Sequence, residues 1–509
     1  MDPQSHSNLQ PRNLSNKFIS MVVLGVFLLV ALAFLGVFLL VVPAKVVPSE
    51  ATESRFLIKK LPGFVGDLPI TLETGYIGVG ESKEVQLFYY FVESEGNPEN
   101  DPLLFMLAGG PGCSALNKIV AETGPFTFDY EYSTSKKLIV EMNPYSWTKV
   151  GNIIVVDQPA GTGFSYAKNP QAYITNDTLA ATQAYQFLGK WLMDHPKFLK
   201  NPLYVTGDSY AGILVPMVVQ EIFNGNEVEE GLHMNIKGYV IGNAVTDTSD
   251  EYNSRIAFAH RMALLSDEIY NSTKANCGGE YLNVDSNNSL CINDLQVVDK
   301  CLEKIKQEQV LQPNCDILNT VESPLMRRSL RSLDKASMDI SLLHKVQVEG
   351  CPDKKSKYLA EWGNKKDVRE ALHVREELDD TKFVACNESL KFYYKKEPIS
   401  YTHNVWSTVF YHQHLANKSC QALVYSGDHD MVVPYISTLK WIKSLNLLVV
   451  NDWRPWFVDE QVAGYTMKYS NHSYNLTFAT IKGGAHTSPD NKPKECLRML
   501  MGWLANDAL

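Results

Sequence analysis

A serine in the middle of the chain has the surroundings that nucleophilic catalysis requires. Ser209 lies in the segment Gly-Asp-Ser-Tyr-Ala-Gly at 207–212, between an apolar run at 203–206 and a helix-periodic stretch at 213–223. A serine flanked by small residues at a strand-to-helix turn is typical of a nucleophile elbow, which exposes the hydroxyl group. The usual elbow has glycine on both sides, and Ala211 departs mildly from that pattern. We predict that Ser209 is the nucleophile of an acyl-transfer site.

The base and the acid that would activate this serine follow it in the chain. A serine hydroxyl is a weak nucleophile near neutral pH and needs a histidine base that an acid orients. His486 comes soon after an apolar run that ends at Ile481, and Asp430 comes directly after another apolar run. The order serine, acid, histidine is that of α/β-hydrolases. We predict Asp430 as the acid, rather than Asp428, because it lies further into the loop that would face the serine.

Two backbone N–H groups are expected to stabilise the negative charge of a tetrahedral intermediate. One belongs to Tyr210, the residue after the predicted nucleophile. The other belongs to the turn Gly-Gly-Pro-Gly at 109–112, which follows the apolar run 103–107. The missing side chains of this turn let a ligand approach the backbone. We assign the second donor to Gly110.

The segments around these residues alternate as they do in an α/β protein. Short apolar runs of the kind buried in a mostly parallel sheet alternate with stretches of helical periodicity. The expected strands are 85–92, 103–107, 152–156, 203–206, 236–241, 422–425 and 476–481. The expected helices are 179–192 and 213–223. This pattern predicts an α/β-hydrolase fold with a central, mostly parallel sheet.

The strand signals stop between about 246 and 351, where charged, Asn-rich and Cys-containing sequence takes over. We interpret this stretch as a lid of helices and loops, inserted into an α/β-hydrolase domain that covers residues 50–509. It contains the basic run Met-Arg-Arg-Ser-Leu-Arg-Ser-Leu at 326–333, with arginines from Arg327 to Arg331. This run fits either a solvated loop or a site of proteolytic processing, and the loop is slightly favoured.

The strongest break in composition comes near the start of the chain. Residues 18–42 carry no charge, and a helix of that length can cross a bilayer. Arg12 and Lys17 would keep residues 1–17 in the cytosol and direct the rest of the chain to the lumen. The length of the apolar run favours an uncleaved signal anchor over a signal peptide, and cleavage after Ala44 is the alternative.

Composition also favours delivery to an oxidising compartment. Nine cysteines without a C-x-x-C pair favour disulfides over a zinc site, and Cys496 is the candidate for a buried free thiol. With 47 basic against 57 acidic residues, the chain lacks the positive excess that nucleic-acid binding requires. Seven Asn-x-Ser/Thr triplets predict glycosylation at Asn176, Asn271, Asn287, Asn387, Asn417, Asn471 and Asn475.

Three ordered motifs resemble the serine carboxypeptidase family. They are Gly-Gly-Pro-Gly-Cys-Ser at 109–114, the segment at 207–212, and Gly-Ala-His-Thr at 484–487. The resemblance extends from about residue 56 to the C-terminus and implies an α/β-hydrolase fold with an inserted lid. It also implies three disulfides, which join Cys113 to Cys351, Cys277 to Cys291, and Cys301 to Cys315.

The family contains peptidases and plant acyltransferases that take the acyl group from a 1-O-β-glucose ester. The resemblance implies that peptidases grip the substrate's terminal carboxylate with an Asn before the double glycine and with two glutamates that share a proton. Here the Asn place is Ala108, next to Gly109, and one glutamate place is Asp208. Glu122 remains at the other place. The peptidase site for a terminal carboxylate is therefore expected to be incomplete.

Further differences favour the acyltransferase branch. Met106 stands where peptidases usually have tryptophan, and the stretches 72–78, 157–163 and 429–434 resemble the acyltransferases. We therefore expect an enzyme that moves an acyl group from an acylglucose, through an acyl-serine, to an acceptor hydroxyl or amine. A serine-type carboxypeptidase is the alternative, and an inactive lumenal binding protein is a third hypothesis.

The expected partners are a small-molecule donor and a small-molecule acceptor, with no metal, no cofactor and no nucleic acid. The pair His412 and His414 lacks an acidic or cysteine partner at metal-ligand spacing, so we expect ordinary surface or packing residues there. Residues 18–42 would contact a membrane if they are not cleaved. The resemblance implies the lumen of the plant vacuole, and the sequence leaves the oligomeric state open.

Overall fold

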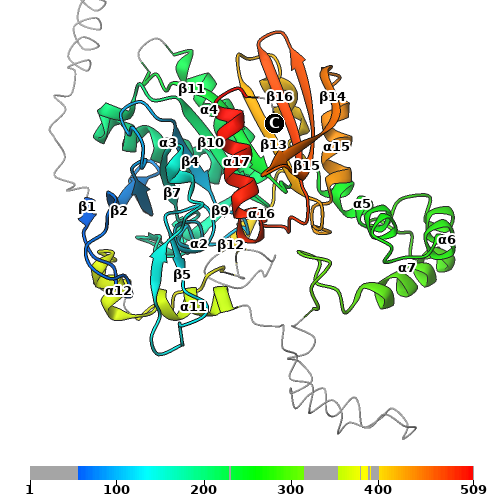
Figure 1. Ribbon diagram of the computed structural model, residues 1–509, viewed down its shortest axis with the longest axis horizontal. Helices are drawn as coiled ribbons and strands as arrows, with labels where there is room; N and C mark the ends of the chain where they lie inside the picture. The colour runs from blue at the N-terminus through cyan, green and yellow to red at the C-terminus, as the bar shows by residue number, and fades with distance from the viewer. Residues whose placement is uncertain are drawn as a thin grey trace, which may run out of the picture. The chain divides into compact units, whose positions relative to one another are not determined.

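One mixed sheet of twelve strands runs through the computed structural model (Figure 1), which describes residues 55–228, 231–314, 354–378, 380–387, 390, 400–507 and 509. From edge to edge, its strands are β1 (Arg55–Ile58), β2 (Leu72–Val79), β3 (Val85–Val92), β7 (Asn152–Val156), β4 (Leu103–Leu107), β10 (Leu203–Asp208), β11 (Ile236–Gly242), β13 (Gln421–Gly427), β16 (Tyr474–Ile481), β15 (Gln461–Asn471) and β14 (Leu448–Val458). The short strand β8 (Tyr166–Ala167) pairs with β3. The strands from β7 to β16 are parallel, and antiparallel strands flank them on both sides.

All seven strands that the apolar runs predict are present in this sheet. The runs are fully buried in β4 and β7, as central strands of a parallel sheet require. The sequence analysis missed the antiparallel hairpin of β14 and β15. Strand β14 is exposed over most of its length and contains Pro455. An edge strand tolerates proline because one side of its backbone forms no hydrogen bonds with a neighbouring strand.

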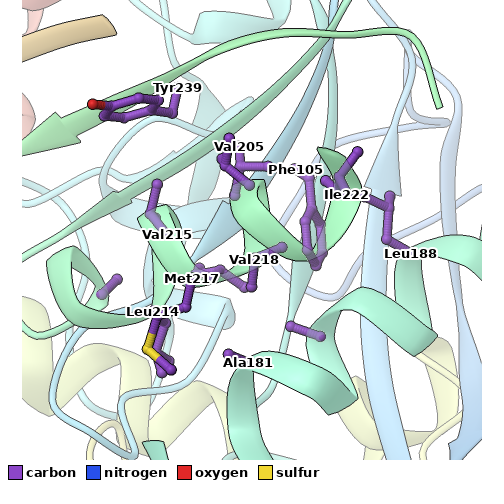
Figure 2. Packing of buried hydrophobic residues seen from close by; sticks show 14 of the residues in the cluster. Phe105, Ala181, Leu188, Val205, Leu214, Val215, Met217, Val218, Ile222 and Tyr239 are labelled. Carbon is purple, nitrogen blue, oxygen red and sulfur yellow. The ribbon is translucent and has the colours of Figure 1, made fainter. Parts of the chain in front are cut away.

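Helices cover both faces of the sheet because successive strand residues point to opposite sides. Phe105 of β4 and Val205 of β10 pack in one core with α3 (Asp177–Asp194) and α4 (Ala211–Asn226), as Figure 2 shows. Leu104 and Met106 belong to the core on the other face. That second core includes residues of α2 (Leu116–Ala121), α11 (Lys354–Gly363), α12 (Lys366–Ala371) and α17 (Pro493–Leu504).

One side-chain cap and two small sheets accompany the large sheet. Asn176 caps α3, since its Oδ1 accepts a hydrogen bond of 2.9 Å from the N–H of Leu179. Strand β9 (Ile174–Asn176) pairs with β12 (Ser400–Thr402), and β5 (Phe126–Phe128) pairs with β6 (Val140–Met142). Three further α-helices are α14 (Val409–Leu415), α15 (Tyr435–Ser444) and α16 (Ser488–Asn491).

The stretch in which a lid is predicted contains three helices, which Figure 1 shows set apart from the sheet. They are α5 (Thr248–Arg261), α6 (Asp267–Cys277) and α7 (Ser289–Leu302). They have a small core of their own, in which Phe258 and Val298 pack near Met431 of the sheet domain. Residues 315–351 of the predicted lid, including the basic run 326–333, lie outside the described residues.

The predicted N-terminal segments 1–17 and 18–42 also lie outside the described residues. Among the helices that the structure does describe, none is long and apolar enough to cross a membrane.

Candidate active site

The predicted elbow is a sharp turn between β10 and α4. Ser209 follows the last residue of β10 and has a φ of 54°, a left-handed conformation that is rare for a residue with a side chain. Gly207 must lack a side chain, since a Cβ there would lie 2.6 Å from Cβ of Ala211 and 3.1 Å from the carbonyl oxygen of Leu107. The fully buried methyl group of Ala211 fits this turn, so alanine can take the place of the second glycine.

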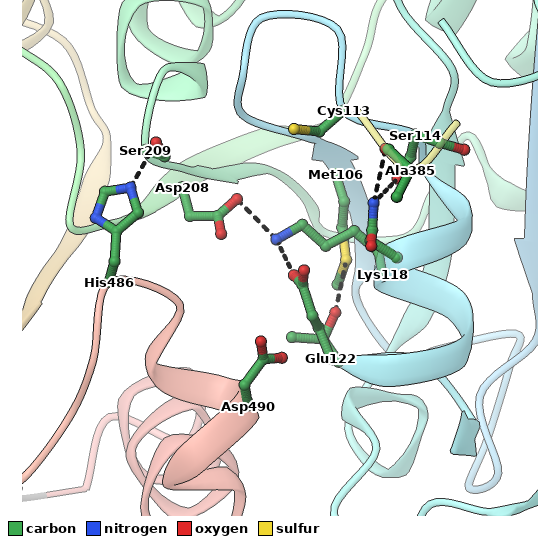
Figure 3. A network of polar contacts seen from close by, with 12 residues as sticks. Met106, Cys113, Ser114, Lys118, Glu122, Asp208, Ser209, Ala385, His486 and Asp490 are labelled. Carbon is green, nitrogen blue, oxygen red and sulfur yellow. Dashed lines mark hydrogen bonds and ion pairs between the residues drawn. The ribbon is translucent and has the colours of Figure 1, made fainter. Parts of the chain in front are cut away.

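The structure brings the predicted serine, histidine and aspartate together through two hydrogen bonds. Nε2 of His486 lies 2.7 Å from Oγ of Ser209, and Nδ1 lies 2.8 Å from Oδ2 of Asp430. Figure 3 shows the imidazole directed at the serine hydroxyl. The three residues follow β10, β13 and β16, which run parallel and therefore end at the same edge of the sheet. Asp428, the alternative acid, instead accepts a hydrogen bond of 2.6 Å from the N–H of Gly483.

Asp430 is held rigidly because donors surround its carboxylate. Its side chain is fully buried. Nδ2 of Asn243 donates to Oδ2 at 2.8 Å, and the N–H of Val432 donates to Oδ1 at 2.8 Å. Asn243 also accepts a hydrogen bond from the N–H of Gly427 at 3.0 Å, which ties the acid loop to the end of β11. The sequence analysis missed Asn243, although a polar residue directly after a buried strand was a usable signal.

The surroundings of His486 favour its protonated form. Burial lowers the pKa of the imidazole, but the charge and hydrogen bond of Asp430, with smaller contributions from Asp208 and Glu308, outweigh burial. The net effect is a pKa above the usual histidine value of 6.5. A histidine beside a buried carboxylate can therefore receive a proton from a serine hydroxyl and hold it during a reaction.

A segment after α7 contacts both loops that carry the acid and the base. The N–H of Met431 donates to the carbonyl oxygen of Gln307 at 2.8 Å, and the N–H of His486 donates to that of Glu308 at 2.8 Å. The N–H of Val310 donates to the carbonyl oxygen of His429 at 3.1 Å. This segment of the predicted lid thus helps to fix the positions of the acid and the histidine.

The glycine-rich turn lies against the serine, as an oxyanion site requires. A Cβ on Gly109 would lie 2.8 Å from Cβ and 3.4 Å from Oγ of Ser209, so a side chain there would displace the nucleophile. Gly110 follows with a φ of 118° and precedes a cis peptide bond to Pro111. Tyr210 is the N-cap of α4, so its N–H lies at the positive end of a helix. Both predicted donors, Gly110 and Tyr210, therefore belong to turns that meet at Ser209.

The side chain of Tyr210 joins a polar cluster that the sequence analysis missed. Its hydroxyl donates a short hydrogen bond to Oδ1 of Asp177 and lies 2.6 Å from Nδ1 of His403. The hydroxyl of Tyr401 donates to the same carboxylate oxygen at 2.8 Å, and the N–H of Asn404 donates to Oδ2 at 2.7 Å. These residues come from distant parts of the sequence, and the pairing of β9 with β12 brings Asp177 close to Tyr401 and Asn404.

The predicted substrate residues Glu122 and Asp208 meet through a lysine (Figure 3). Nζ of Lys118 donates to Oδ1 of Asp208 at 2.7 Å and makes a shorter contact with Oε2 of Glu122. Lys355 approaches Oε1 of Glu122 at 3.4 Å. Ala108, at the end of β4, is half-buried and has no side-chain group that can donate a hydrogen bond. The sequence analysis missed Lys118, because a lysine four residues before a glutamate usually lies on an exposed helix face.

One of the predicted disulfides is wrong. Cys113 is bonded to Cys386 and not to Cys351, which lies outside the described residues. The N–H of Ser114 donates to the carbonyl oxygen of Ala385 at 2.8 Å, and this contact places the next residue, Cys386, directly beside Cys113. The prediction took its partner from the family resemblance, and the sequence alone contains no signal for this docking.

The other cysteines are distributed between the lid and the core. The structure contains the Cys277–Cys291 disulfide, which joins α6 to α7. The prediction that Cys301 pairs with Cys315 cannot be compared with the structure because Cys315 lies outside the described residues. Cys496 is a fully buried free thiol in α17.

The predicted glycosylation sites differ in exposure. Asn271, Asn287, Asn417 and Asn475 are exposed, whereas Asn176, Asn387 and Asn471 are half-buried. The side-chain nitrogen of Asn387 donates to the carbonyl oxygen of Gly161 at 2.9 Å. The exposed group offers room for a glycan, and glycosylation of all seven remains a prediction.

The mostly parallel sheet, the elbow and the hydrogen-bonded serine, histidine and aspartate define a serine enzyme of the α/β-hydrolase class. Residues 62–506 match the serine carboxypeptidase family, and the chain belongs to this family. It is 44% identical over 461 residues to serine carboxypeptidase-like 17 of Arabidopsis thaliana, which covers 90% of this chain and 95% of that protein. It is 40% identical over 496 residues to serine carboxypeptidase-like 1 of the same plant, which covers 97% of this chain and all of that protein.

The crystal structure of Kex1Δp, a prohormone-processing carboxypeptidase from Saccharomyces cerevisiae, has the same fold. The TM-score is 0.66 at 19% identity, and the match covers 89% of this chain and 96% of that chain. The predicted α/β-hydrolase fold is therefore confirmed. The disulfides, together with the plant relatives, fit a protein of the secretory pathway.

Proposed function

We propose that this enzyme transfers an acyl group from a 1-O-β-acylglucose ester to the hydroxyl or amine of a small acceptor. One observation carries the proposal: a hydrogen-bonded Ser209–His486–Asp430 array lies beside Ala108 and Asp208, at the places where asparagine and glutamate are expected in a peptidase of this family. Ala108 provides no amide donor, and Lys118 occupies the space between the two nearby carboxylates. The site thus has the chemistry for acyl transfer without the usual recognition of a peptide end.

In the proposed reaction, Oγ of Ser209 attacks the ester carbonyl carbon while Nε2 of His486 takes the hydroxyl proton. The N–H groups of Gly110 and Tyr210 stabilise the oxyanion. The bond to the glucose oxygen then breaks, and His486 gives its proton to the leaving sugar. Asp430 orients the imidazole throughout and stabilises its charged form.

The second half of the reaction regenerates the serine. The acceptor hydroxyl or amine attacks the acyl-serine as His486 takes its proton, and that proton passes to Oγ of Ser209 when the acyl bond to the enzyme breaks. Water can make the same attack. Transfer exceeds hydrolysis only where the acceptor is held close to the acyl-serine, since proximity raises its effective concentration far above that of a free solute.

A paired assay of the purified protein between pH 5 and 7 tests this function. One arm contains a panel of aromatic 1-O-β-acylglucoses with candidate acceptors, and the other contains blocked dipeptides. Ser209→Ala is the control in both arms. Acylated product that requires Ser209, without dipeptide cleavage, supports the transferase.

Two other outcomes contradict the proposal. Cleavage of dipeptides without transfer would identify a carboxypeptidase, which the names of the relatives favour. Inactivity in both arms would favour a binding protein on an inactive scaffold. We further propose the vacuolar lumen as the site of action and, if residues 18–42 are retained, attachment to its membrane.

A further inference from the structure

A buried lysine lies at the centre of the polar network next to Ser209 (Figure 3). Lys118 is only 7% exposed and forms ion pairs with both Glu122 and Asp208, which are 8% and 7% exposed. Glu122 is the C-cap of the same helix, α2, whereas Asp208 ends β10 directly before the nucleophile. The ammonium group therefore joins two carboxylates that would otherwise face each other in the interior.

This lysine places a positive charge between two buried carboxyl groups. Two buried carboxyl groups in close proximity repel each other, so without a cation one of them keeps a proton. A protonated carboxyl group is a hydrogen-bond donor and can bind an anion, whereas an ionised carboxylate only accepts hydrogen bonds. Burial opposes the charge of Glu122, but Lys118 and then Lys355 outweigh burial and lower the pKa of Glu122 to about 2.

We propose that Lys118 determines specificity because its ammonium group pairs with both Glu122 and Asp208 in place of a shared proton, so that the pocket beside Ser209 rejects ligands with a carboxylate. The same ionised oxygens can accept hydrogen bonds from the hydroxyl groups of a sugar. No described residue donates a hydrogen bond to Oδ2 of Asp208, which leaves one carboxylate oxygen for such a contact. This inference deepens the proposed function and rests on it for the identity of the leaving group.

The other charged groups in the network do not replace Lys118. Lys355 contacts Glu122 at 3.4 Å and Asp490 at 2.5 Å, and among the described residues it forms no ion pair with Asp208. His486 and Lys118 lie on opposite sides of Asp208 (Figure 3), and His486 is hydrogen-bonded to Asp430. Among the described residues, Lys118 is thus the cation that pairs with both carboxylates.

The space beside the network is also small. A cavity of about 20 Å³ adjoins Lys118, Asp208, Thr123 and Met106. That volume holds roughly one water molecule. A hydroxyl group or a water fits such a space more readily than a carboxylate group, so size and charge favour the same kind of ligand.

Binding measured in a Ser209→Ala background tests the inference without any turnover. The probes are N-benzoylglycyl-phenylalanine, whose carboxylate is ionised above about pH 4.5, and the amide of the same dipeptide. Calorimetry gives the ratio of their affinities from pH 4.5 to 7. In the parent protein, the acid should bind no more tightly than the amide. The ratio should not change between pH 4.5 and 6, because His486, whose pKa is raised above 6.5, stays protonated in that range.

The variant Lys118→Met keeps an unbranched side chain, one atom shorter, and removes its charge. We expect it to bind the acid at least about tenfold more tightly than the amide at pH 4.5, because a charge-assisted hydrogen bond becomes available. This preference should disappear toward pH 7, when the shared proton is lost. A purely structural role would not create a pH-dependent preference for a carboxylate.

Two controls isolate the shared proton. Lys355→Met removes a lysine that pairs with Glu122 and Asp490 but not with Asp208. The double variant Lys118→Met with Asp208→Asn replaces one of the two carboxylates, so no pair remains to share a proton. Both should keep the affinity ratio of the parent. The inference is overturned if the parent itself binds the acid more tightly as the pH falls, if folded Lys118→Met shows no preference, or if either control gains one.

Because these readouts need no catalysis, they stay separate from the proposed function. An absence of acyl transfer in the assay above would leave the affinity ratios unchanged. The parent measurement also requires no variant in the network, so the inference can be refuted even if Lys118→Met fails to fold.

Discussion

Replacement of Asp430 by asparagine should shift the pH at which His486 becomes an effective base. The hydrogen bond between Nδ1 of His486 and Oδ2 of Asp430 is 2.8 Å long and buried. A hydrogen bond to a charged group contributes about 1.5–3 kcal/mol. At about 1.36 kcal/mol per pKa unit, its loss should lower the pKa of His486 by roughly one to two units.

The sign follows from the role of the histidine. Only the neutral imidazole can take the proton of Ser209, so the rate of serine modification rises with pH through the pKa of His486. The wild-type inflection should lie above 6.5, in accord with the raised pKa, and the Asp430→Asn inflection should lie below it. The maximal rate should also fall by about 10³–10⁴-fold, because the amide no longer holds the imidazole in the required tautomer.

The assay is the pH dependence of Ser209 labelling by diisopropyl fluorophosphate, which needs no knowledge of the natural substrate. Asp428→Asn is the matched control, since Asp428 bonds to the N–H of Gly483 instead of the histidine. Its inflection should move by no more than about a third of a pH unit. An Asp430→Asn inflection equal to or above that of the wild type would refute the assignment of the acid.

Three further predictions follow from the site and its supports. Gly109→Ala should slow labelling of Ser209 by about a hundredfold or more, because the new Cβ would lie 2.8 Å from Cβ of the serine; unchanged labelling in the folded variant would contradict this. Cys386→Ser should lower the free energy of unfolding by about 2–5 kcal/mol in urea titrations, through loss of a cross-link between residues 273 apart. Glu122→Gln should lower the free energy of unfolding at pH 5–7. The difference from the wild type should shrink as the pH falls from about 4.5 toward 2, because the pKa of Glu122 is lowered in the folded protein. A difference that grows as the pH falls would contradict this prediction.

The sequence was a reliable guide to the central sheet and to the residues at its carboxyl edge. Runs such as 103–107 are buried on both faces of the sheet, so a short continuous stretch of apolar residues marks them in the sequence. The loops that carry Asp430 and His486 follow such strands, and parallel strands place their following loops together. Local pattern and tertiary position therefore agree for these residues.

Other features depend on contacts that local sequence does not encode. Strand β14 is one half of a hairpin at the edge of the sheet. Its exposed positions carry both polar and apolar residues, so its sequence pattern resembles neither a buried strand nor a helix. Lys118 and Glu122 have the i,i+4 spacing of an ion pair on a helix surface. In the folded protein, Asp208 at the end of β10 also pairs with Lys118, and the three residues form a buried network. The partner of Cys113 was missed for a similar reason, because a docked segment 273 residues away provides it.

The Cys113–Cys386 bond has a consequence for a chain that is cut within the lid. Cleavage in the basic run 326–333 would leave Ser209 on one polypeptide and His486 on the other. The disulfide would hold the two chains together, because Cys113 precedes the cut and Cys386 follows it. Strand β11 of the first chain would also stay paired with β13 of the second. The product would be a two-chain enzyme whose catalytic residues come from both chains. It would run as a single band on a non-reducing gel and as two bands after reduction.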